Sequence, residues 1–208
     1  MRGPVTLAVT GPLACGKSTF VRILGELGAE TVSADSLVHD LLSGDPETIR
    51  SIAGRFGKGV RAEEGSIDRK ALAGTVFGDP EALKDLEDIL HPLVREETDR
   101  RVAASGAEVF VAEIPLLFEG ERSGRFDLTV AVTAPEVRRR AWAAKRGMGE
   151  DQRRTIEARQ LPQEEKARRA DVVVKNDGDL DKLRAQARRL FEKVRGGSGR
   201  RGHEGEEE

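Results

Sequence analysis

The stretch from Gly11 to Ser18 contains the residue types that bind nucleotide phosphates. It reads Gly-Pro-Leu-Ala-Cys-Gly-Lys-Ser and matches the pattern Gly-x-x-x-x-Gly-Lys-Ser/Thr in full. Backbone N–H groups of such a loop surround phosphate oxygens, and the N-terminus of the following helix adds partial positive charge. Lys17 supplies a full charge to the β- and γ-phosphates, and the Ser18 hydroxyl is a candidate Mg²⁺ ligand. The candidate nucleotide-binding residues here are Gly11, Ala14, Cys15, Gly16, Lys17, Ser18 and Thr19.

Cys15 lies inside this loop, just before the expected helix. The helix N-terminus and the nearby Lys17 charge both favour a thiolate, so we expect a thiol more reactive than that of an ordinary exposed cysteine. Whether or not the thiol is activated, a bulky adduct is expected to inactivate the protein, and bound ATP with Mg²⁺ to slow its formation. The alternative is that Cys15 is only a small residue tolerated at a variable position.

The phosphate loop alone does not separate kinases from GTPases and motor ATPases. A GTPase is expected to carry Asn-Lys-x-Asp for guanine and an Asp-x-x-Gly switch, and the sequence contains neither. The nearest string, Lys175-Asn176-Asp177-Gly178, has the wrong order. The sequence therefore favours a kinase or another ATP-binding protein.

Two acidic residues follow expected strands and are candidates for chemistry at the γ-phosphate. The carboxyl ends of parallel strands face one ligand crevice, which predicts that Asp35 projects toward the phosphate loop. A carboxylate there accepts a proton from an attacking hydroxyl or positions it, although Asp35 also suits the N-cap of a helix. Glu113 ends another expected strand, where it either holds Mg²⁺ through water or is a simple strand-end charge.

Alternating strands and helices must position these residues. Short runs rich in β-branched residues predict strands, and apolar residues at helical spacing predict helices between them. This alternation indicates an α/β protein with a parallel sheet covered on both faces. The expected strands are residues 5–10, 30–34, 108–114, 128–132 and 172–174.

The expected helices carry recognisable start signals. A helix follows the phosphate loop over residues 19–27, and Asp45-Pro46-Glu47 and Asp79-Pro80-Glu81 each supply an N-cap aspartate and an N1 proline. Pro92 is expected to kink or divide the second of these helices. A long basic helical region is expected from Pro135 to about residue 169, interrupted near 147 and 149, and a closing helix over 179–194.

Composition narrows the class of protein further. The net charge is −2 and only one cysteine is present, so no intrachain disulfide can form and a reducing, cytoplasmic location is expected. No apolar run approaches a membrane span, and no signal peptide is expected at the N-terminus. Few aromatic residues accompany the arginines of 138–159, so nucleic acid is not an expected partner.

Motifs spread along nearly the whole chain resemble those of the dephospho-coenzyme A kinase family. Besides the phosphate loop, Arg140 and Arg146 fall where the family's lid helix carries arginines, and Gln160 where it carries a glutamine. Ser33 replaces the first acid of the family's Asp-Ala-Asp signature, and residues 12–15 differ from its usual loop. The other matching segments are Ser33-Ala34-Asp35, Ile67 to Leu72 with Val76-Phe77, Leu90-His91-Pro92-Leu93, Pro115-Leu116-Leu117-Phe118-Glu119, and Ala170 to Val173 leading to Asn176 and Gly178.

The resemblance implies a fold, an activity and roles. It implies a nucleoside-monophosphate-kinase-like parallel sheet with a helical acceptor-binding insert and a lid. It also implies phosphorylation of the ribose 3′-hydroxyl of dephospho-coenzyme A by ATP with Mg²⁺. The implied catalytic residues are Asp35, Lys17 and Arg140, with Arg146 and Asn176 added to the nucleotide site. The implied acceptor-binding residues are Asp35, Arg69, His91, Pro115, Leu116 and Phe118. A packing role is the alternative for His91, where the family motif favours binding, and it is an equal alternative for Phe118.

The implied organisation is a single kinase unit over residues 1–195. Its core is 1–54, 106–136 and 166–195, its acceptor-binding region about 55–105 and its lid about 137–165, followed by a disordered charged tail over 196–208. Two other functions stay open at this point: a P-loop kinase for a nucleoside, nucleotide or sugar acid, and a nucleotide-sensing module without turnover. The sequence does not indicate an oligomeric state.

Overall fold

The computed structural model describes residues 3–120 and 123–196, and the tail prediction for 197–208 lies outside these residues. The chain divides into two compact units. The core unit comprises the described residues up to Val32 and from Ala104 onward, and the helical unit comprises Ser33–Ala103. Each unit is described by itself.

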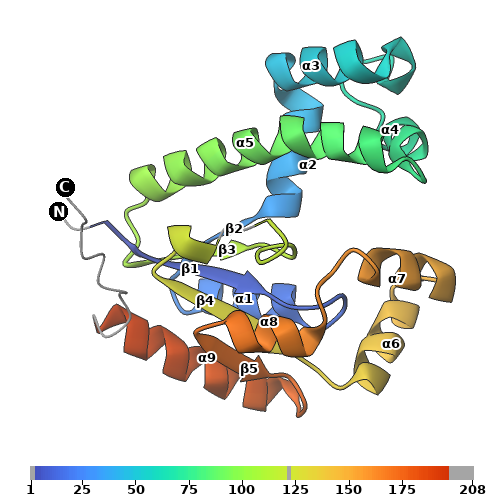
Figure 1. Cartoon of the computed structure of the whole chain (residues 1–208). Helices are drawn as coiled ribbons and strands as arrows, with labels where there is room; N and C mark the ends of the chain where they lie inside the picture. Colours follow the sequence, from blue (N-terminus) through green and yellow to red (C-terminus); the bar gives the residue numbers. More distant parts are fainter. Residues whose placement is uncertain (1–2, 121–122, 197–208) are drawn as a thin grey trace, which may run out of the picture. The chain divides into compact units, whose positions relative to one another are not determined.

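The sheet of the core unit has five strands in the order β2-β3-β1-β4-β5 (Figure 1). β1 pairs in parallel with β3 and β4, and β4 pairs in parallel with β5. The strands are β1 (Val5–Thr10), β2 (Glu30–Ser33), β3 (Val109–Glu113), β4 (Leu128–Thr133) and β5 (Val172–Lys175). The predicted α/β class and parallel sheet are confirmed.

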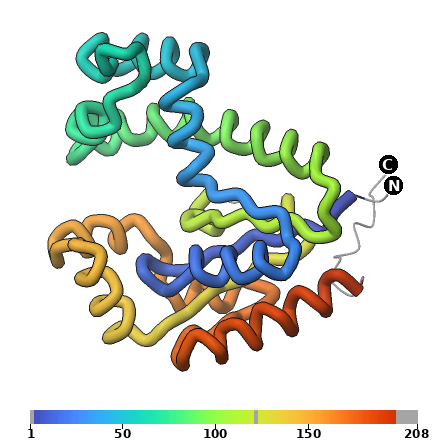
Figure 2. The backbone as a smooth tube through the Cα atoms, turned by 180° about the vertical axis from the view of Figure 1, so that it is seen from behind, coloured from blue at the N-terminus to red at the C-terminus, as the bar shows by residue number. Residues whose placement is uncertain are grey.

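Helices connect these strands and cover the sheet. α1 and α9 pack against each other and against strands, as Figures 1 and 2 both show, and α8 packs on β4. The basic region forms three helices, because the chain breaks near residues 147–149, as predicted, and again between 158 and 162. The core-unit helices are α1 (Lys17–Glu26), η2 (Ser123–Arg125), α6 (Glu136–Lys145), α7 (Glu150–Glu157), α8 (Gln163–Arg169) and α9 (Leu180–Arg195).

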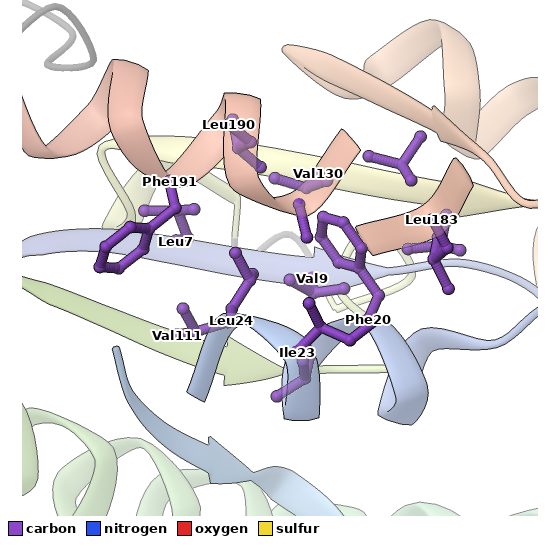
Figure 3. Packing of buried hydrophobic residues seen from close by; sticks show 14 of the residues in the cluster. Leu7, Val9, Phe20, Ile23, Leu24, Val111, Val130, Leu183, Leu190 and Phe191 are labelled. Atoms are coloured by element: carbon purple, nitrogen blue, oxygen red, sulfur yellow. The ribbon is translucent and has the colours of Figure 1, made fainter. Parts of the chain in front are cut away.

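Apolar side chains from the sheet, α1 and α9 form the main hydrophobic cluster (Figure 3). Leu7 and Val9 of β1 are fully buried against Phe20 and Leu24 of α1. β1 is thus buried between its two neighbours, as expected for an apolar central strand in a parallel sheet. This rigid packing fixes the end of β1, from which the phosphate loop begins.

The helical unit packs around a second apolar cluster. Its helices are α2 (Ala34–Gly44), α3 (Pro46–Phe56), η1 (Lys58–Val60), α4 (Arg69–Val76) and α5 (Pro80–Ala104). Leu42 of α2 and Ile52 of α3 belong to the same cluster as Leu72 of α4. Residues 33–54, assigned to the core from the sequence, are therefore part of this unit, because their apolar faces pack here.

Side-chain caps fix where the helices of this unit begin. Asp45 accepts a hydrogen bond from the Thr48 N–H at 2.8 Å, and Asp79 accepts from the N–H groups of Glu81 and Ala82 at 3.0 Å, so both predicted caps are confirmed. α5 continues without a break through Pro92, so the expected division is wrong. Leu90 and Val94, which flank Pro92, are both buried, so the helix is packed on both sides of the proline.

Candidate active site

Two glycines give the phosphate loop its conformation. Gly16 has φ of 96°, and a Cβ there would lie 2.3 Å from Nδ2 of Asn176. Gly11 has φ of 148°, and a Cβ there would lie 2.3 Å from the Val132 carbonyl oxygen. L-residues with a side chain are strained at these dihedrals and have no room here. The loop therefore requires glycine at both positions of the pattern.

Lys17 is held inside the curve of this loop. Its side chain is buried, and Nζ donates to the carbonyl oxygens of Gly11 at 3.0 Å and Pro12 at 2.9 Å. An ammonium group has three donors, so these bonds leave one for a phosphate oxygen. The structure thus places a positive charge inside the phosphate loop.

Ser18 and Glu113 form an oxygen pair beside the loop. The Ser18 hydroxyl, on the exposed first turn of α1, donates to Oε1 of Glu113 at 2.8 Å. Glu113 ends β3 and is only 9 % exposed. Mg²⁺ in phosphate-transfer sites is bound by one or two protein oxygens together with phosphate oxygens and water. The Ser18 and Glu113 oxygens therefore fit a magnesium ion. The hydrogen bond from Ser18 also shows that Glu113 is more than an unpaired charge at the end of a strand.

A cavity of about 330 Å³ opens next to the phosphate loop. Asn176 forms part of its wall, and the Asn176 amide donates to the Cys15 carbonyl oxygen at 3.0 Å. The predicted residues Ala14, Gly16, Thr19, Arg146 and Asn176 all line it. The lining also includes Trp142, Lys145, Gly178, Asp179, Leu180 and Leu183.

Trp142 is the aromatic residue of this cavity, and sequence reasoning missed it. It lies on α6, four positions before Arg146, which is the C-cap residue of that helix, and both residues line the cavity. Its ring also lies 6.0 Å from the Arg138 guanidinium carbon. A flat aromatic surface beside a phosphate loop suits a nucleobase. In the sequence, the four-residue spacing between Trp142 and Arg146 could have indicated that Trp142 belongs to the site.

The segment after α7 contacts the phosphate loop directly. The Leu13 N–H donates to Oε1 of Gln160 at 2.8 Å. One helical turn earlier, Glu157 accepts from Nη1 of Arg139 at 2.7 Å. Nε of Arg139 is buried and has no hydrogen-bond partner among the described residues. Arg139 is therefore a guanidinium with a free donor close to the loop.

Arg140, the arginine predicted to act in catalysis, has a different environment. Its side chain is 55 % exposed and forms an i, i+4 ion pair with Glu136 at 2.8 Å. The Arg139 side chain is only 14 % exposed, and its charge is among those that lower the pKa of the Cys15 thiol. Arg139 is thus within electrostatic reach of the phosphate loop, whereas Arg140, in the part of the chain that the structure describes, pairs with Glu136 at the surface.

The sequence predicted a Cys15 thiol that ionises readily, and the structure shows the opposite direction for its pKa. The Cys15 side chain is fully buried in the main hydrophobic cluster. Burial raises the pKa of the thiol, and the Lys17 charge offsets only part of this rise. The local argument from the helix N-terminus failed because the side chain points into the core, where a thiolate loses its hydration.

The loop after β3 combines buried and accessible residues. The Pro115 carbonyl oxygen accepts from the Thr10 hydroxyl at 3.1 Å, and Leu116 is partly exposed. Phe118 is only 5 % exposed, which favours the packing role over stacking on a ligand. Of the residues predicted to bind the acceptor from this loop, Pro115 and Leu116 are therefore more accessible than Phe118.

The remaining predicted acceptor residues lie in the helical unit. Asp35 is exposed in the first turn of α2, whose N-cap is Ser33, and its carboxylate caps no helix in the described structure. The N-cap interpretation of Asp35 is therefore wrong, because α2 begins at Ala34 and not at Ser36. Arg69 begins α4, and its Nη1 lies 3.2 Å from Nδ1 of His39, a histidine given no role from the sequence. His91 is partly buried within α5.

Comparisons with known proteins agree with these features. The family model described as dephospho-CoA kinase matches residues 5–182. The chain is 40 % identical over 199 residues to dephospho-CoA kinase of Anaeromyxobacter dehalogenans, covering 94 % of each chain. A crystal structure of a Thermus thermophilus protein superposes with a TM-score of 0.79 at 34 % identity, covering 92 % of this chain and 98 % of the other. The dephospho-CoA kinase structure from Campylobacter jejuni superposes with a TM-score of 0.68 at 29 % identity, with the same coverage.

Among the described residues, no helix is long and apolar enough to cross a membrane.

Proposed function

The chain belongs to the dephospho-CoA kinase family, and we propose that it transfers the γ-phosphoryl group of ATP to the ribose 3′-hydroxyl of dephospho-coenzyme A. One observation carries the proposal beyond family membership. The phosphate loop curves around the Lys17 ammonium group, and a cavity that suits a nucleoside lies beside it. The reaction yields coenzyme A and ADP, the last step of coenzyme A biosynthesis, and we place the protein in the cytoplasm.

The nucleotide binds in the core unit. The triphosphate occupies the loop from Gly11 to Ser18, where backbone N–H groups and the Lys17 ammonium meet its oxygens. The base occupies the cavity beside Trp142, and Arg146 and Asn176 contact the nucleoside from its walls. These contacts align the γ-phosphoryl group, and alignment supplies much of the rate in phosphoryl transfer.

Magnesium fits the oxygens of Ser18 and Glu113. When bound, the ion neutralises charge on the β- and γ-phosphates. Ser18 would be a direct ligand, and Glu113 would accept hydrogen bonds from the ion's water molecules, because it already lies 2.8 Å from the Ser18 hydroxyl. The chain itself contributes charge through Lys17 and through Arg139, which has a buried donor free for the transferred group.

The acceptor side of the reaction uses the helical unit. The Asp35 carboxylate accepts the proton of the 3′-hydroxyl as its oxygen attacks the γ-phosphorus. Its exposure and its freedom from a capping role support this assignment. Arg69 and His91 of this unit bind the negatively charged acceptor, and the family resemblance assigns Pro115 and Leu116 of the core unit to the acceptor as well.

The basic helices α6 to α8 act in this reaction and do not bind nucleic acid. Their arginines are largely paired: Arg153 with Glu150 and Glu157, and Arg168 and Arg169 with Glu165. Pairing of this kind lowers the pKa of Glu150 to about 2 and leaves little free positive charge for a polyanion. The partner is therefore a small molecule.

An acceptor panel tests the proposal. The purified protein is incubated with MgATP and, separately, dephospho-coenzyme A, adenosine, AMP, shikimate or gluconate, and ADP release is measured. We expect turnover with dephospho-coenzyme A at least 10²-fold above the others, as sites built for several contacts discriminate on about that scale. Mass spectrometry should locate the new phosphate on the 3′-oxygen.

The same experiment separates the rival functions. Turnover that is fastest with another acceptor would overturn the substrate assignment. Saturable ATP binding without turnover on any acceptor would indicate a nucleotide sensor. Binding is measurable through Trp142, because the chain has one tryptophan and no tyrosine, so its ultraviolet fluorescence reports on this cavity alone.

A further inference from the structure

A lysine outside the phosphate loop is fully buried in the core unit. Lys166 lies in α8, and its side chain has no exposed surface. Burial lowers the pKa of Lys166, and the neighbouring Glu119 carboxylate only partly compensates. Lysine is rarely buried completely, because removing its ammonium group from water is costly. The reaction proposed above gives this residue no role.

The contacts of Lys166 reach both loops of the candidate site. Nζ donates to the Pro115 carbonyl oxygen at 2.7 Å and pairs with Oε1 of Glu119 at 2.6 Å. The Pro115 carbonyl also accepts from the hydroxyl of Thr10, the last residue of β1. The ammonium group therefore holds the loop of residues 115–119 beside the strand end from which the phosphate loop begins.

Glu119 extends these contacts to the segment after α7. Its Oε1 accepts from the N–H of Leu161 at 2.7 Å. Leu161 follows Gln160, whose side chain accepts from the Leu13 N–H of the phosphate loop. Hydrogen bonds, with the Gln160–Leu161 backbone between them, thus join Lys166 and Glu119 to a backbone group of the loop that receives the phosphates.

The ion pair between Lys166 and Glu119 is not explained by its contribution to folding stability alone. Replacing a buried ion pair by apolar residues of similar volume is often neutral or stabilising. Oε2 of Glu119 is buried with no hydrogen-bond partner among the described residues, so the pair is not fully satisfied. A role in positioning explains its presence better than a gain in folding free energy does.

We propose that Lys166 and Glu119 are positioning residues for phosphoryl transfer, whose ion pair holds Gln160 on the Leu13 N–H and Pro115 beside Thr10, and so fixes the phosphate loop in its productive conformation. The inference rests on the proposed function and assigns it a further pair of residues. Neither residue touches substrate. They act because a displacement of about 1 Å at such a site costs about 10²-fold in rate.

The first test removes both charges together. Lys166→Met/Glu119→Leu keeps the volume and leaves no buried charge unpaired, so the full-length protein should fold. We expect kcat to fall at least tenfold with less than a threefold change in KM for ATP. Hydrogen exchange at the Leu13 amide should accelerate. The exposed pair Arg22→Met/Glu26→Leu of α1 is the control, with kcat within twofold of wild type.

The second test asks whether the pair acts through Gln160. Gln160→Ala leaves Lys166 and Glu119 intact and should reproduce the fall in kcat. Added to the double variant, it should cause less than a twofold further loss, because the contact is already absent. If the double variant does not fold, the Gln160→Ala variant still tests whether turnover depends on the contact between Gln160 and the Leu13 N–H.

Either of two results would overturn the inference. One is a folded double variant with kcat within twofold of wild type and unchanged exchange at Leu13. The other is a Gln160→Ala variant with wild-type kcat. Failure of the proposed function is distinguishable, because the wild-type protein would then not phosphorylate dephospho-coenzyme A, whereas exchange at Leu13 would still respond to the pair.

Discussion

The phosphate loop of the core unit and the predicted acceptor residues of the helical unit are built in different ways. In the loop, Lys17 is buried and donates two hydrogen bonds to backbone carbonyl groups, and a Cβ on Gly16 would overlap Asn176. In the helical unit, Asp35 is exposed and Arg69 contacts another side chain, His39, at the protein surface.

This difference shows how each half of the site is specified. The nucleotide side is fixed by backbone geometry and burial, so its residues can be recognised from physical constraints within the fold. The acceptor residues predicted in the helical unit are polar side chains on helices, which no local constraint distinguishes from other polar residues of these helices. Their assignment depends on family membership and on experiment.

Replacing Lys17 should have the largest effect. Lys17→Met removes the loop's central charge, and we expect turnover to fall by about 10³-fold, the scale of losing a main electrostatic group at a reacting centre. Steady-state ADP release measures this. Lys193→Met, an exposed lysine of α9, is the control and should keep full activity. A folded Lys17→Met protein with wild-type turnover would refute the assignment of the loop.

The two adjacent arginines of α6 should differ in effect. Arg139→Ala should lower kcat by about 10²-fold, because a buried donor near the phosphates acts on charge that develops in the transition state. Arg140→Ala should change kcat by less than about twofold, because exposed i, i+4 pairs contribute little. Pre-steady-state measurement of the chemical step compares them. The reverse order of effects would return the role to Arg140, as predicted from the sequence.

Cys15 should show the smallest effect. Because burial raises the pKa of its thiol, the folded protein should react with iodoacetamide more than about tenfold slower than the unfolded chain, through local opening only. The reaction should also reach half its maximal rate above the usual thiol pKa. Mass spectrometry after timed quenching gives the rate, and the single cysteine leaves no ambiguity about the site. Fast labelling that ATP prevents would instead support a thiol facing the nucleotide.

The sequence predicted what local patterns determine. The phosphate loop, the five strands and the caps Asp45 and Asp79 follow from residue type and spacing over a few positions. The second break in the basic region, between α7 and α8, was missed although Pro162, the N-cap residue of α8, marks it in the sequence.

Tertiary packing decided the remaining features. Cys15 looked activated by its helix N-terminus, yet the direction of its side chain into the core reversed the argument. Lys166 stands in the charged string Gln-Glu-Glu-Lys-Ala-Arg-Arg, which is typical of an exposed helix, but its ammonium group is buried on Glu119. Burial of a single side chain within a polar segment depends on neighbours distant in sequence, which one sequence does not reveal.

The central claim is that the core unit supplies the nucleotide site and the helical unit supplies the proton acceptor. It is tested most directly by measuring ATP binding and turnover in Asp35→Asn. Titration of Trp142 fluorescence with MgATP should give a Kd within about twofold of wild type, while turnover falls by about 10²- to 10⁴-fold, the usual contribution of a general base. Asp40→Asn, on the same helix, should leave both unchanged. An Asp35→Asn protein that is folded and turns over at the wild-type rate, or that loses ATP binding in proportion to turnover, would contradict the account.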